Sequence, residues 1–370
     1  LGGLARGNSV FKVIAMDNPL KSDLDHILAH TQGLWDELRG RRLFITGGTG
    51  FFGCWLLESL AWANDKLGLN VRAVVLTRKP EAFAHKAPHL ANHPAISFHA
   101  GDIRNFAFPE GPFSHVIHAA TEASVKLNAA NPLLMFDTIV AGTRRALDFA
   151  VQAGAGKVLL ASSGAVYGRQ PPEMTHIPEG YHGGPDPLDT KSAYGEGKRA
   201  AELLCGLYAK QHGLEPKIAR GFAFVGPYLP LDAHFAVGNF IRDGLRGGPI
   251  QVKGDGTPYR SYLYAADLAI WLWTILCKGE PCRPYNVGSE NGITIAELAH
   301  QAAGCFHPAP RVAIAPAPGG VDGQAQKKPE RYVPSVQRCA LELGLRQTFD
   351  LREAIRRTVA WRQIKTDFTA

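Results

Sequence analysis

Residues 43–53 read LFITGGTGFFG, and this stretch decides the fold of the chain. The apolar run 43–46 predicts a buried strand, and residues 52–63 predict a helix. The glycines between them permit a tight turn, close approach of the backbone to a pyrophosphate, and close contact of helix and strand. Free N–H groups at the start of such a helix attract phosphate. The stretch therefore predicts dinucleotide binding, and a purely structural glycine-rich turn is the alternative. The residues expected at the cofactor are Gly47, Thr49, Gly50, Phe51, Phe52 and Gly53.

Short apolar runs alternate with amphipathic stretches up to residue 220. We expect further strands at 71–76, 96–98, 115–118, 158–162 and 217–220, and helices at 132–154 and 193–212. This alternation is typical of βαβ units, which build a parallel sheet with helices on both faces. The predicted fold class is α/β, with a Rossmann-type doubly wound parallel sheet and a smaller mixed α/β C-terminal domain.

The chain divides into three parts. Residues 1–40 predict an N-terminal helical extension, and residues 41–220 the dinucleotide-binding domain. Residues 221–370 predict mainly the second domain, with some chain returning to the first. Within it, residues 221–262 are rich in Gly, Pro and aromatics, which predicts loops over a pocket. Residues 267–277, 295–303 and 351–362 predict helices, and the Pro-rich stretch 304–329 predicts a long surface connection.

Composition excludes several classes of protein. The chain has 370 residues, with 40 Lys and Arg against 33 Asp and Glu, a formal charge of +7. The basic residues are scattered without a basic tail, which argues against nucleic acid as a partner. We find no apolar run of about 18 residues and no stretch typical of a signal peptide, so we expect no membrane association. Six scattered cysteines predict free thiols in a reducing compartment, and we expect a cytoplasmic protein.

The end of the second predicted strand bears on the choice of cofactor. An NAD site usually has Asp or Glu there, bound to the ribose 2′-hydroxyl, whereas this chain reads Thr77-Arg78-Lys79. Arg78 can instead pair with the 2′-phosphate of NADP. A solvated surface arginine is the alternative. We therefore expect tightly bound NAD or NADP, with NADP slightly favoured.

Tyr194 and Lys198 lie four residues apart, on one face of a predicted helix. A nearby ammonium lowers the pKa of a phenol, so Tyr194 is a candidate general base. Upstream, Ser163 stands at the end of a predicted strand and can hydrogen-bond the same substrate oxygen. A turn or cap at the strand end is the alternative role for this serine.

The order of these motifs resembles the extended short-chain dehydrogenase/reductases of the nucleotide-sugar epimerase/dehydratase family. The resemblance covers about residues 41–365. The motifs that carry it are the turn at 47–53, residues 101–103, 118–120 and 162–168, Tyr194 with Lys198, Arg220 before 226–227, 254–256 before Arg260 and 267–268, and residues 285–288.

The resemblance implies roles for matching positions. Ser163, Tyr194 and Lys198 would be the catalytic trio, with the latter two also at the cofactor. Asp102 and Ile103 would border the adenine, and Ala119 and Ala120 would run beside the cofactor. Arg260 would hold the diphosphate of a nucleoside-diphosphate sugar. Further substrate-binding positions in the 221–250 region would be Ala223 and Asn239. The family usually pairs subunits through helices matching 132–154 and 193–212, so we expect a homodimer.

Departures from the family pattern narrow the expected reaction. The 4,6-dehydratases carry Thr-Asp-Glu where this chain has Ser163-Gly164-Ala165, and decarboxylases tend to have Glu at the last position. Epimerases tolerate small residues there. Ala223 and Ile139 each replace a familiar asparagine. We expect a C4 epimerase acting through a transient keto-sugar. The alternatives are an NADPH-dependent keto-sugar reductase, a dehydratase or decarboxylase, and a non-catalytic dinucleotide sensor.

Two further groups of residues invite functional interpretation. A distant acid on a loop, such as Glu122, Glu179 or His234, can in principle replace the missing carboxylates. His85, His89 and His93 recur every four residues, but Pro88 argues against one continuous helix and favours a surface segment over a metal site.

Overall fold

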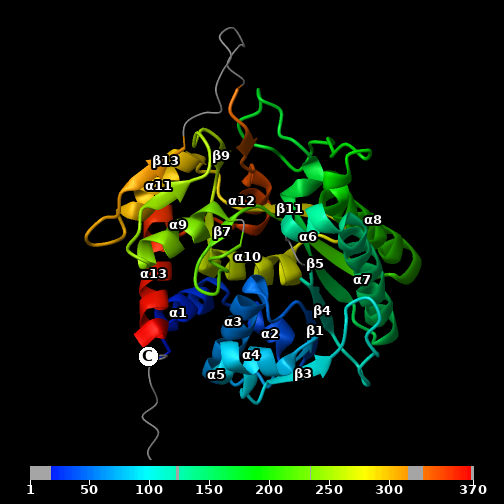
Figure 1. Cartoon of the computed structure of the whole chain (residues 1–370). Coiled ribbons are helices and arrows are strands. Elements are labelled where there is room, and N and C mark those ends of the chain that lie inside the picture. The colour runs from blue at the N-terminus through cyan, green and yellow to red at the C-terminus, as the bar shows by residue number, and fades with distance from the viewer. Residues whose placement is uncertain (1–17, 122–124, 234, 316–327, 368–370) are drawn as a thin grey trace, which may run out of the picture.

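A parallel sheet of seven strands forms the centre of the molecule (Figure 1). The computed structural model describes residues 18–121, 125–233, 235–315 and 328–367. The strand order is β11-β6-β5-β4-β1-β2-β3, and all neighbouring pairs are parallel. The strands span Arg42–Thr46 (β1), Arg72–Thr77 (β2), Ile96–Ala100 (β3), His115–His118 (β4), Lys157–Ser163 (β5), Glu215–Gly221 (β6) and Pro284–Val287 (β11).

Helices cover both faces of this sheet, because successive strand residues point to opposite sides. In β1, Leu43 and Ile45 join the apolar cluster beneath α3 (Phe51–Leu67) and α10 (Ala265–Lys278). Phe44 joins the opposite cluster, beneath α7 (Pro132–Gln152) and α8 (Ala193–His212). The doubly wound α/β fold predicted from the alternation of strands and helices is therefore confirmed.

From residue 18 on, two helices precede β1: α1 (Lys21–His30) and α2 (Trp35–Leu38). The buried Asp23 of α1 accepts hydrogen bonds from Tyr264, at 2.8 Å, and from Arg357 of α13 (Leu351–Asp367), at 2.6 Å. Burial raises the pKa of Asp23, and its two partners oppose that rise. The first and last described helices lie side by side (Figure 1), and this polar cluster joins them.

Residues 221–262 were predicted to form loops over a pocket. They contain a helix, so this prediction was wrong for that part of the segment. Helix α9 spans Ala236–Leu245, and its apolar face packs on α11 (Ile295–Ala303) and β8 (Ile250–Val252). Gly238 and Gly244 lower its intrinsic helix propensity, which explains why the pattern did not predict it.

Small sheets build the rest of the C-terminal region. Their strands are β7 (Phe224–Val225), β9 (Tyr259–Arg260), β10 (Leu263–Tyr264), β12 (Ile293–Thr294), β13 (Val312–Ile314) and β14 (Arg331–Tyr332), followed by α12 (Gln337–Leu343). Strand β14 pairs with β9 in parallel. β11 comes from the same region yet lies at the edge of the large sheet.

Short helices complete the described chain. They are α4 (Pro80–Lys86), α5 (Pro88–Ala91) and α6 (Val125–Ala130), with 3-10 turns at Gly164–Tyr167 (η1) and Thr190–Ser192 (η2). Pro88 begins α5 and separates His85 from His89 and His93, as expected. Over the described ranges, none of the helices combines the length and the apolar character that crossing a bilayer requires.

Candidate active site

The glycine turn between β1 and α3 packs directly on neighbouring backbone, which excludes a side chain at Gly47 and at Gly53. Gly47 has a φ of +72°, and a Cβ there would stand 2.5 Å from the carbonyl carbon of Ala119. A Cβ on Gly53 would stand 2.3 Å from the carbonyl carbon of Gly48. Gly50 is the N-cap of α3, and no side chain caps that helix. Its first N–H groups are thus available, and the turn fits a dinucleotide pyrophosphate.

The end of β4 borders this turn and is fixed by a buried histidine. His118 contacts Thr46 Oγ1 at 2.8 Å and Thr143 Oγ1 at 3.1 Å. Burial lowers the pKa of His118 to about 3, so its ring is neutral. The N–H groups of Ala119 and Ala120 donate to the carbonyl and hydroxyl oxygens of Thr46. These bonds hold the two alanines next to Gly47, beside the predicted cofactor path.

The residues predicted at the adenine end lie beyond β2 and β3. Asp102 accepts hydrogen bonds from Arg104 at 2.8 and 3.1 Å, and this pairing lowers the pKa of its carboxyl. Arg78 is exposed at the end of β2, and its charge also lowers the pKa of Asp102. Ile103 is buried against Gly142 of α7. Arg104 was not among the predicted site residues, although it directly follows the 101–103 motif.

The predicted trio meets where β5 ends and α8 begins. Ser163 is the last residue of β5, and its hydroxyl accepts from the N–H of Ala165 at 3.2 Å. Tyr194 lies in the first turn of α8. Lys198 Nζ donates to Thr121 Oγ1 at 2.8 Å and to the Ala161 carbonyl at 2.7 Å. Burial raises the pKa of Tyr194, and the adjacent Ser163 side chain opposes that rise. Ser163 and Tyr194 are therefore neighbours, with Lys198 one turn further along the helix.

Lys198 does not lower the pKa of Tyr194 below its ordinary value in this structure. Its ammonium is 6.0 Å from the centroid of the Tyr194 ring, and the phenol's net shift is upward because burial dominates. Burial instead lowers the pKa of Lys198 itself to about 8, while Glu202 one turn later opposes this. The charge of Lys198 alone therefore does not produce the lowered pKa of Tyr194 that the sequence predicted.

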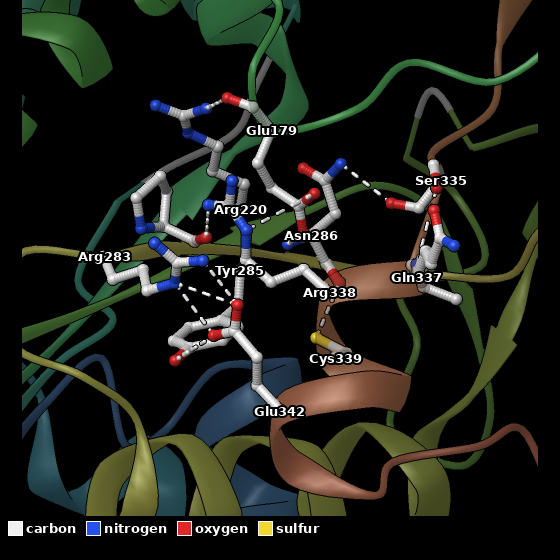
Figure 2. Close-up of polar contacts among 12 residues, drawn as sticks. Glu179, Arg220, Arg283, Tyr285, Asn286, Ser335, Gln337, Arg338, Cys339 and Glu342 are labelled. Atoms are coloured by element: carbon white, nitrogen blue, oxygen red, sulfur yellow. Dashed lines mark hydrogen bonds and ion pairs between the residues drawn. The ribbon is translucent and has the colours of Figure 1, made fainter.

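A polar network surrounds Asn286 at the end of β11 (Figure 2). The Tyr167 hydroxyl donates to Asn286 Oδ1 at 2.7 Å and accepts from Arg220 at 2.9 Å. Asn286 in turn donates to the carbonyls of Ile177 and Ser335, and its N–H donates to Glu179 Oε1. The Tyr167 and Asn286 motifs were part of the family pattern, but their direct contact was not predicted.

None of the distant acids considered earlier is placed at the trio by the described residues. Glu122 and His234 lie outside the described ranges. Glu179 lines a separate cavity of about 880 Å³, together with Tyr167, Arg199, Arg220 and Arg338. Neither Ser163 nor Tyr194 lines that cavity. The Glu179 carboxylate accepts from the N–H of Asn286 and lies next to Arg338.

The predicted substrate-binding residues occupy different settings. Arg260 Nη2 donates to Glu330 Oε1 at 2.8 Å and Nη1 to the Tyr259 carbonyl, so its guanidinium is already paired. Asn239 Nδ2 donates to the carbonyls of Ala233 and Phe235, which holds the loop before α9. Ala223 accepts from the N–H of Leu263 through its carbonyl.

Tyr332 of β14 is a residue at the trio that the sequence reasoning missed. Burial raises the pKa of its phenol, the Ser163 side chain opposes that rise, and the nearby Tyr194 adds to it. The available signal was an aromatic residue directly after the polar, Pro-rich stretch 304–329, in Arg331-Tyr332-Val333-Pro334.

Comparisons with known proteins agree with this geometry. Residues 43–288 match the NAD dependent epimerase/dehydratase family. The chain is 31% identical to UDP-glucuronic acid decarboxylase 5 and 32% identical to UDP-glucuronic acid decarboxylase 3 of Arabidopsis thaliana. These alignments cover 85% of this chain and 87% and 86% of the two relatives.

Solved structures with the same fold include two from bacteria. A UDP-glucose 4-epimerase of Thermus thermophilus, solved in complex with NAD, is 28% identical with a TM-score of 0.68, covering 86% of this chain and 98% of its own. A dTDP-glucose 4,6-dehydratase of Streptomyces venezuelae shares the fold at 23% identity and a TM-score of 0.71, covering 88% and 98%.

These findings decide the class of protein and leave the individual reaction open. The similar proteins are decarboxylases, epimerases and dehydratases of nucleotide sugars, so the enzyme class predicted from the motifs is confirmed. Both decarboxylases and epimerases are among the similar proteins. With the family matched over residues 43–288 and relatives aligned over most of their length, the chain belongs to the NAD dependent epimerase/dehydratase family.

Proposed function

We propose that this enzyme epimerises a nucleoside-diphosphate sugar at C4 through a transient 4-keto sugar. The observation that carries the proposal is the convergence of Ser163, Tyr194 and Lys198 beside a glycine turn that fits NAD. Bound NAD supplies the reversible hydride acceptor for such chemistry. The glycine turn, Ala119, Ala120 and Lys198 would hold it.

The chain's own residues carry the proton chemistry in this proposal. Ser163 hydrogen-bonds the C4 oxygen and Tyr194 takes its proton, since the two side chains are adjacent. Lys198, held by Thr121 and the Ala161 carbonyl, supplies positive charge close to the phenol. Arg260 would exchange its contact with Glu330 for the substrate diphosphate, which suits the bidentate geometry of a guanidinium.

The side chains around Ser163 favour epimerisation over water elimination. Elimination needs an acid and a base besides Tyr194, and Gly164 and Ala165 offer neither. Burial raises the pKa of Tyr194 and the Ser163 side chain opposes that rise, with no contribution from a carboxylate. Epimerisation requires only that the keto-sugar turn within the site.

Decarboxylation of a nucleoside-diphosphate hexuronic acid is the second candidate, favoured by the Arabidopsis relatives. A 4-keto hexuronic acid is a β-keto acid, so its C5–C6 bond breaks with loss of carbon dioxide and leaves an enolate. A proton then returns to C5, and the hydride returns to C4. Both candidates share the first step at Tyr194, and the missing carboxylate at position 165 does not prevent the second.

We also propose a homodimer formed by α7 and α8. The two helices pack on each other and expose Leu133, Leu203 and Leu207, which are 76%, 65% and 43% exposed. Exposed large apolar side chains on two paired helices favour association with another surface. A second copy of the same pair of helices offers a matching apolar surface.

The deciding experiment compares products. Purified protein with NAD is incubated with UDP-glucose, UDP-galactose, dTDP-glucose and UDP-glucuronic acid, and products are identified by mass and NMR. A product of unchanged mass with inverted C4 supports the epimerase. Loss of carbon dioxide from UDP-glucuronic acid replaces it with the second candidate, and a product lighter by one water overturns both. Tyr194→Phe should lose about 10²–10⁴-fold in rate, and turnover close to that of the wild type would contradict the role of Tyr194.

A further inference from the structure

The cavity beside Glu179 lies at the edge of the large sheet, where β11 is the outermost strand. Its walls come from η1, the segment 179–183, α8, β6, residues 280–284 and α12. Neither Ser163 nor Tyr194 lines it. Sites for small organic ligands enclose about 300–1,000 Å³, and this cavity has a volume of about 880 Å³. It is therefore large enough for a ligand of its own, apart from the catalytic turn.

Positively charged side chains predominate in the lining of this cavity. Two carboxylates line it, Glu179 and Glu280. Four arginines from four different segments line it as well, namely Arg199, Arg220, Arg283 and Arg338. With four positive charges against two negative ones, the lining favours an anion.

Carboxylates that do not line the cavity hold two of these arginines in place (Figure 2). Glu202 accepts from Nε and Nη2 of Arg220, at 2.9 and 2.6 Å. Glu342 accepts from Arg283 Nε at 2.8 Å. A guanidinium that is fixed in this way needs little reorganisation to bind an anion on its other edge.

Three of the guanidinium groups keep a nitrogen that is not engaged. Among the described residues, no acceptor lies within hydrogen-bond distance of Arg283 Nη1, Arg338 Nη2 or Arg199 Nη2. Arg338 Nη1 donates to the carbonyl of Pro284 at 2.7 Å, which brings this arginine next to Arg283. The side chains of Arg283 and Arg338 are 44% and 21% exposed, so a ligand from solution reaches both. Adjacent guanidinium donors of this kind suit the oxygens of a phosphate.

Aromatic rings supply a second kind of wall. Tyr167 and Tyr181 line the cavity with their ring centroids 6.3 Å apart, and Pro281 adds a further apolar surface. A phosphate ion alone is much smaller than the cavity and has no apolar surface to bury. A nucleobase is flat and packs well on aromatic rings. The lining thus matches a ligand that has a phosphate at one end and a planar ring at the other.

We propose that this cavity binds a nucleoside monophosphate, with the phosphate at Arg283 and Arg338 and the base against Tyr167 and Tyr181. The proposed function assigns the cofactor to the glycine turn and the substrate diphosphate to Arg260. None of the residues in these two assignments lines the cavity, so it is a second nucleotide site on the same chain. The proposal goes beyond the proposed function and does not depend on which sugar reacts.

The test fills the catalytic site first, so that only the second site remains open. NAD-loaded protein is saturated with UDP, and UMP or uridine is then titrated in by calorimetry. We expect UMP to bind and uridine, which lacks the phosphate, to bind at least about tenfold more weakly. Arg283→Gln and Arg338→Gln should each weaken UMP about tenfold, the effect of one lost charge-assisted hydrogen bond. Arg356→Gln is the matched control, because Arg356 is also an exposed arginine paired with a carboxylate but does not line the cavity. It should leave the affinity for UMP unchanged.

Several results would overturn the assignment. They are the absence of UMP binding to the UDP-saturated wild type, equal affinities for UMP and uridine, and wild-type affinity for UMP in either cavity variant. Weakening by Arg356→Gln to the same extent would show a general effect of charge and would also refute the site. The KM for the reacting UDP-sugar should stay within twofold in both cavity variants, and a larger change would place the effect at the catalytic site. Because uridine and UMP are compared on the wild type, the proposal is testable even if a variant fails to fold.

Discussion

Gly164 and Tyr332 are sterically dependent on each other, although they lie in different parts of the chain. A Cβ on Gly164 would stand 2.6 Å from the Tyr332 hydroxyl oxygen and 2.8 Å from the ring of Phe222. A side chain at 164 therefore requires the rings of Tyr332 and Phe222 to shift. The phenol of Tyr332, which packs above Gly164, therefore explains why the middle residue of the Ser163–Ala165 triplet has no side chain.

The first prediction concerns this contact. Gly164→Ala should destabilise the protein by about 1–3 kcal/mol through overpacking and reduce turnover, because it pushes Tyr332 away from Ser163. Thermal unfolding and kcat/KM measure the two effects. Adding Tyr332→Phe should cost less than the sum of the single changes, since the hydroxyl is one of the atoms in the clash. Gly180→Ala is the control, because a Cβ there meets nothing within 4 Å. Equal behaviour of the two alanine variants would contradict the contact.

The second prediction is an alkaline limit set by Lys198. Its pKa is lowered to about 8 by burial, so the ammonium loses its proton as the pH rises through 8 and activity should fall there. The charge of Glu202 favours the protonated form, so Glu202→Gln should move this limb to lower pH. Rate profiles between pH 6 and 10 measure the shift. Glu196→Gln, on the same helix, should leave the limb in place, and an unchanged limb in Glu202→Gln would exclude Lys198 as its origin.

The third prediction is a loss of stability in acid caused by His118. Its pKa is lowered to about 3 in the folded protein, while an unfolded histidine has a pKa near 6.5. The unfolded state therefore binds more protons between these values, and stability falls as the pH falls below about 6.5, by up to about 1.4 kcal/mol per pH unit. Urea unfolding between pH 7 and 4.5 should show a shallower pH dependence for His118→Asn than for the wild type. His85→Asn, at an exposed site, should keep the wild-type slope.

The fourth prediction addresses the cofactor phosphate. Arg78 is exposed at the end of β2 and close enough to Asp102 to lower the pKa of that carboxyl. If Arg78 pairs with a 2′-phosphate, Arg78→Ala should weaken NADP several-fold and leave NAD nearly unchanged, because NAD lacks that group. Titration of both cofactors into apoprotein measures this. Equal affinities of the variant and the wild type for NADP would make Arg78 an ordinary surface residue.

The fifth prediction concerns the exposed leucines of α7 and α8. Leu203→Asp places a charge in the proposed subunit contact and should convert a dimer to a monomer in analytical ultracentrifugation. Leu341 of α12 is 77% exposed and lies outside that contact. Leu341→Asp should therefore leave the mass unchanged. A monomeric wild-type protein would rule out the proposed dimer directly.

The parts of the fold that could be predicted are those with local signals. The strand before the glycine turn, the helix after it and the i, i+4 spacing of Tyr194 and Lys198 each lie within one continuous stretch. Their periodicity or spacing is visible in the sequence because buried strands and amphipathic helices repeat it over several residues. The helices at 193–212 and 295–303 accordingly have the predicted bounds.

The parts that could not be predicted depend on pairing between distant residues. Strands β9 and β14 have two residues each, too few for any period, and their pairing brings Arg331 opposite Tyr259 across the intervening chain. Tyr332 reaches the catalytic turn through that pairing and through the hydrogen bonds of the residues that follow it. The pKa of Tyr194 was misjudged for a related reason: the spacing to Lys198 is local, but the burial that outweighs it comes from the whole surrounding fold.

The cluster of Asp23, Tyr264 and Arg357 has a consequence for biosynthesis. Domains fold roughly in the order in which they leave the ribosome, at about 5–20 residues per second. Helix α1 emerges well before the tyrosine and the arginine that bind its aspartate, which belong to the strand before α10 and to α13. The nascent chain must therefore carry α1 without its full set of polar partners until α13 has been translated. The final docking of α13 then completes both ends of the described chain in a single event.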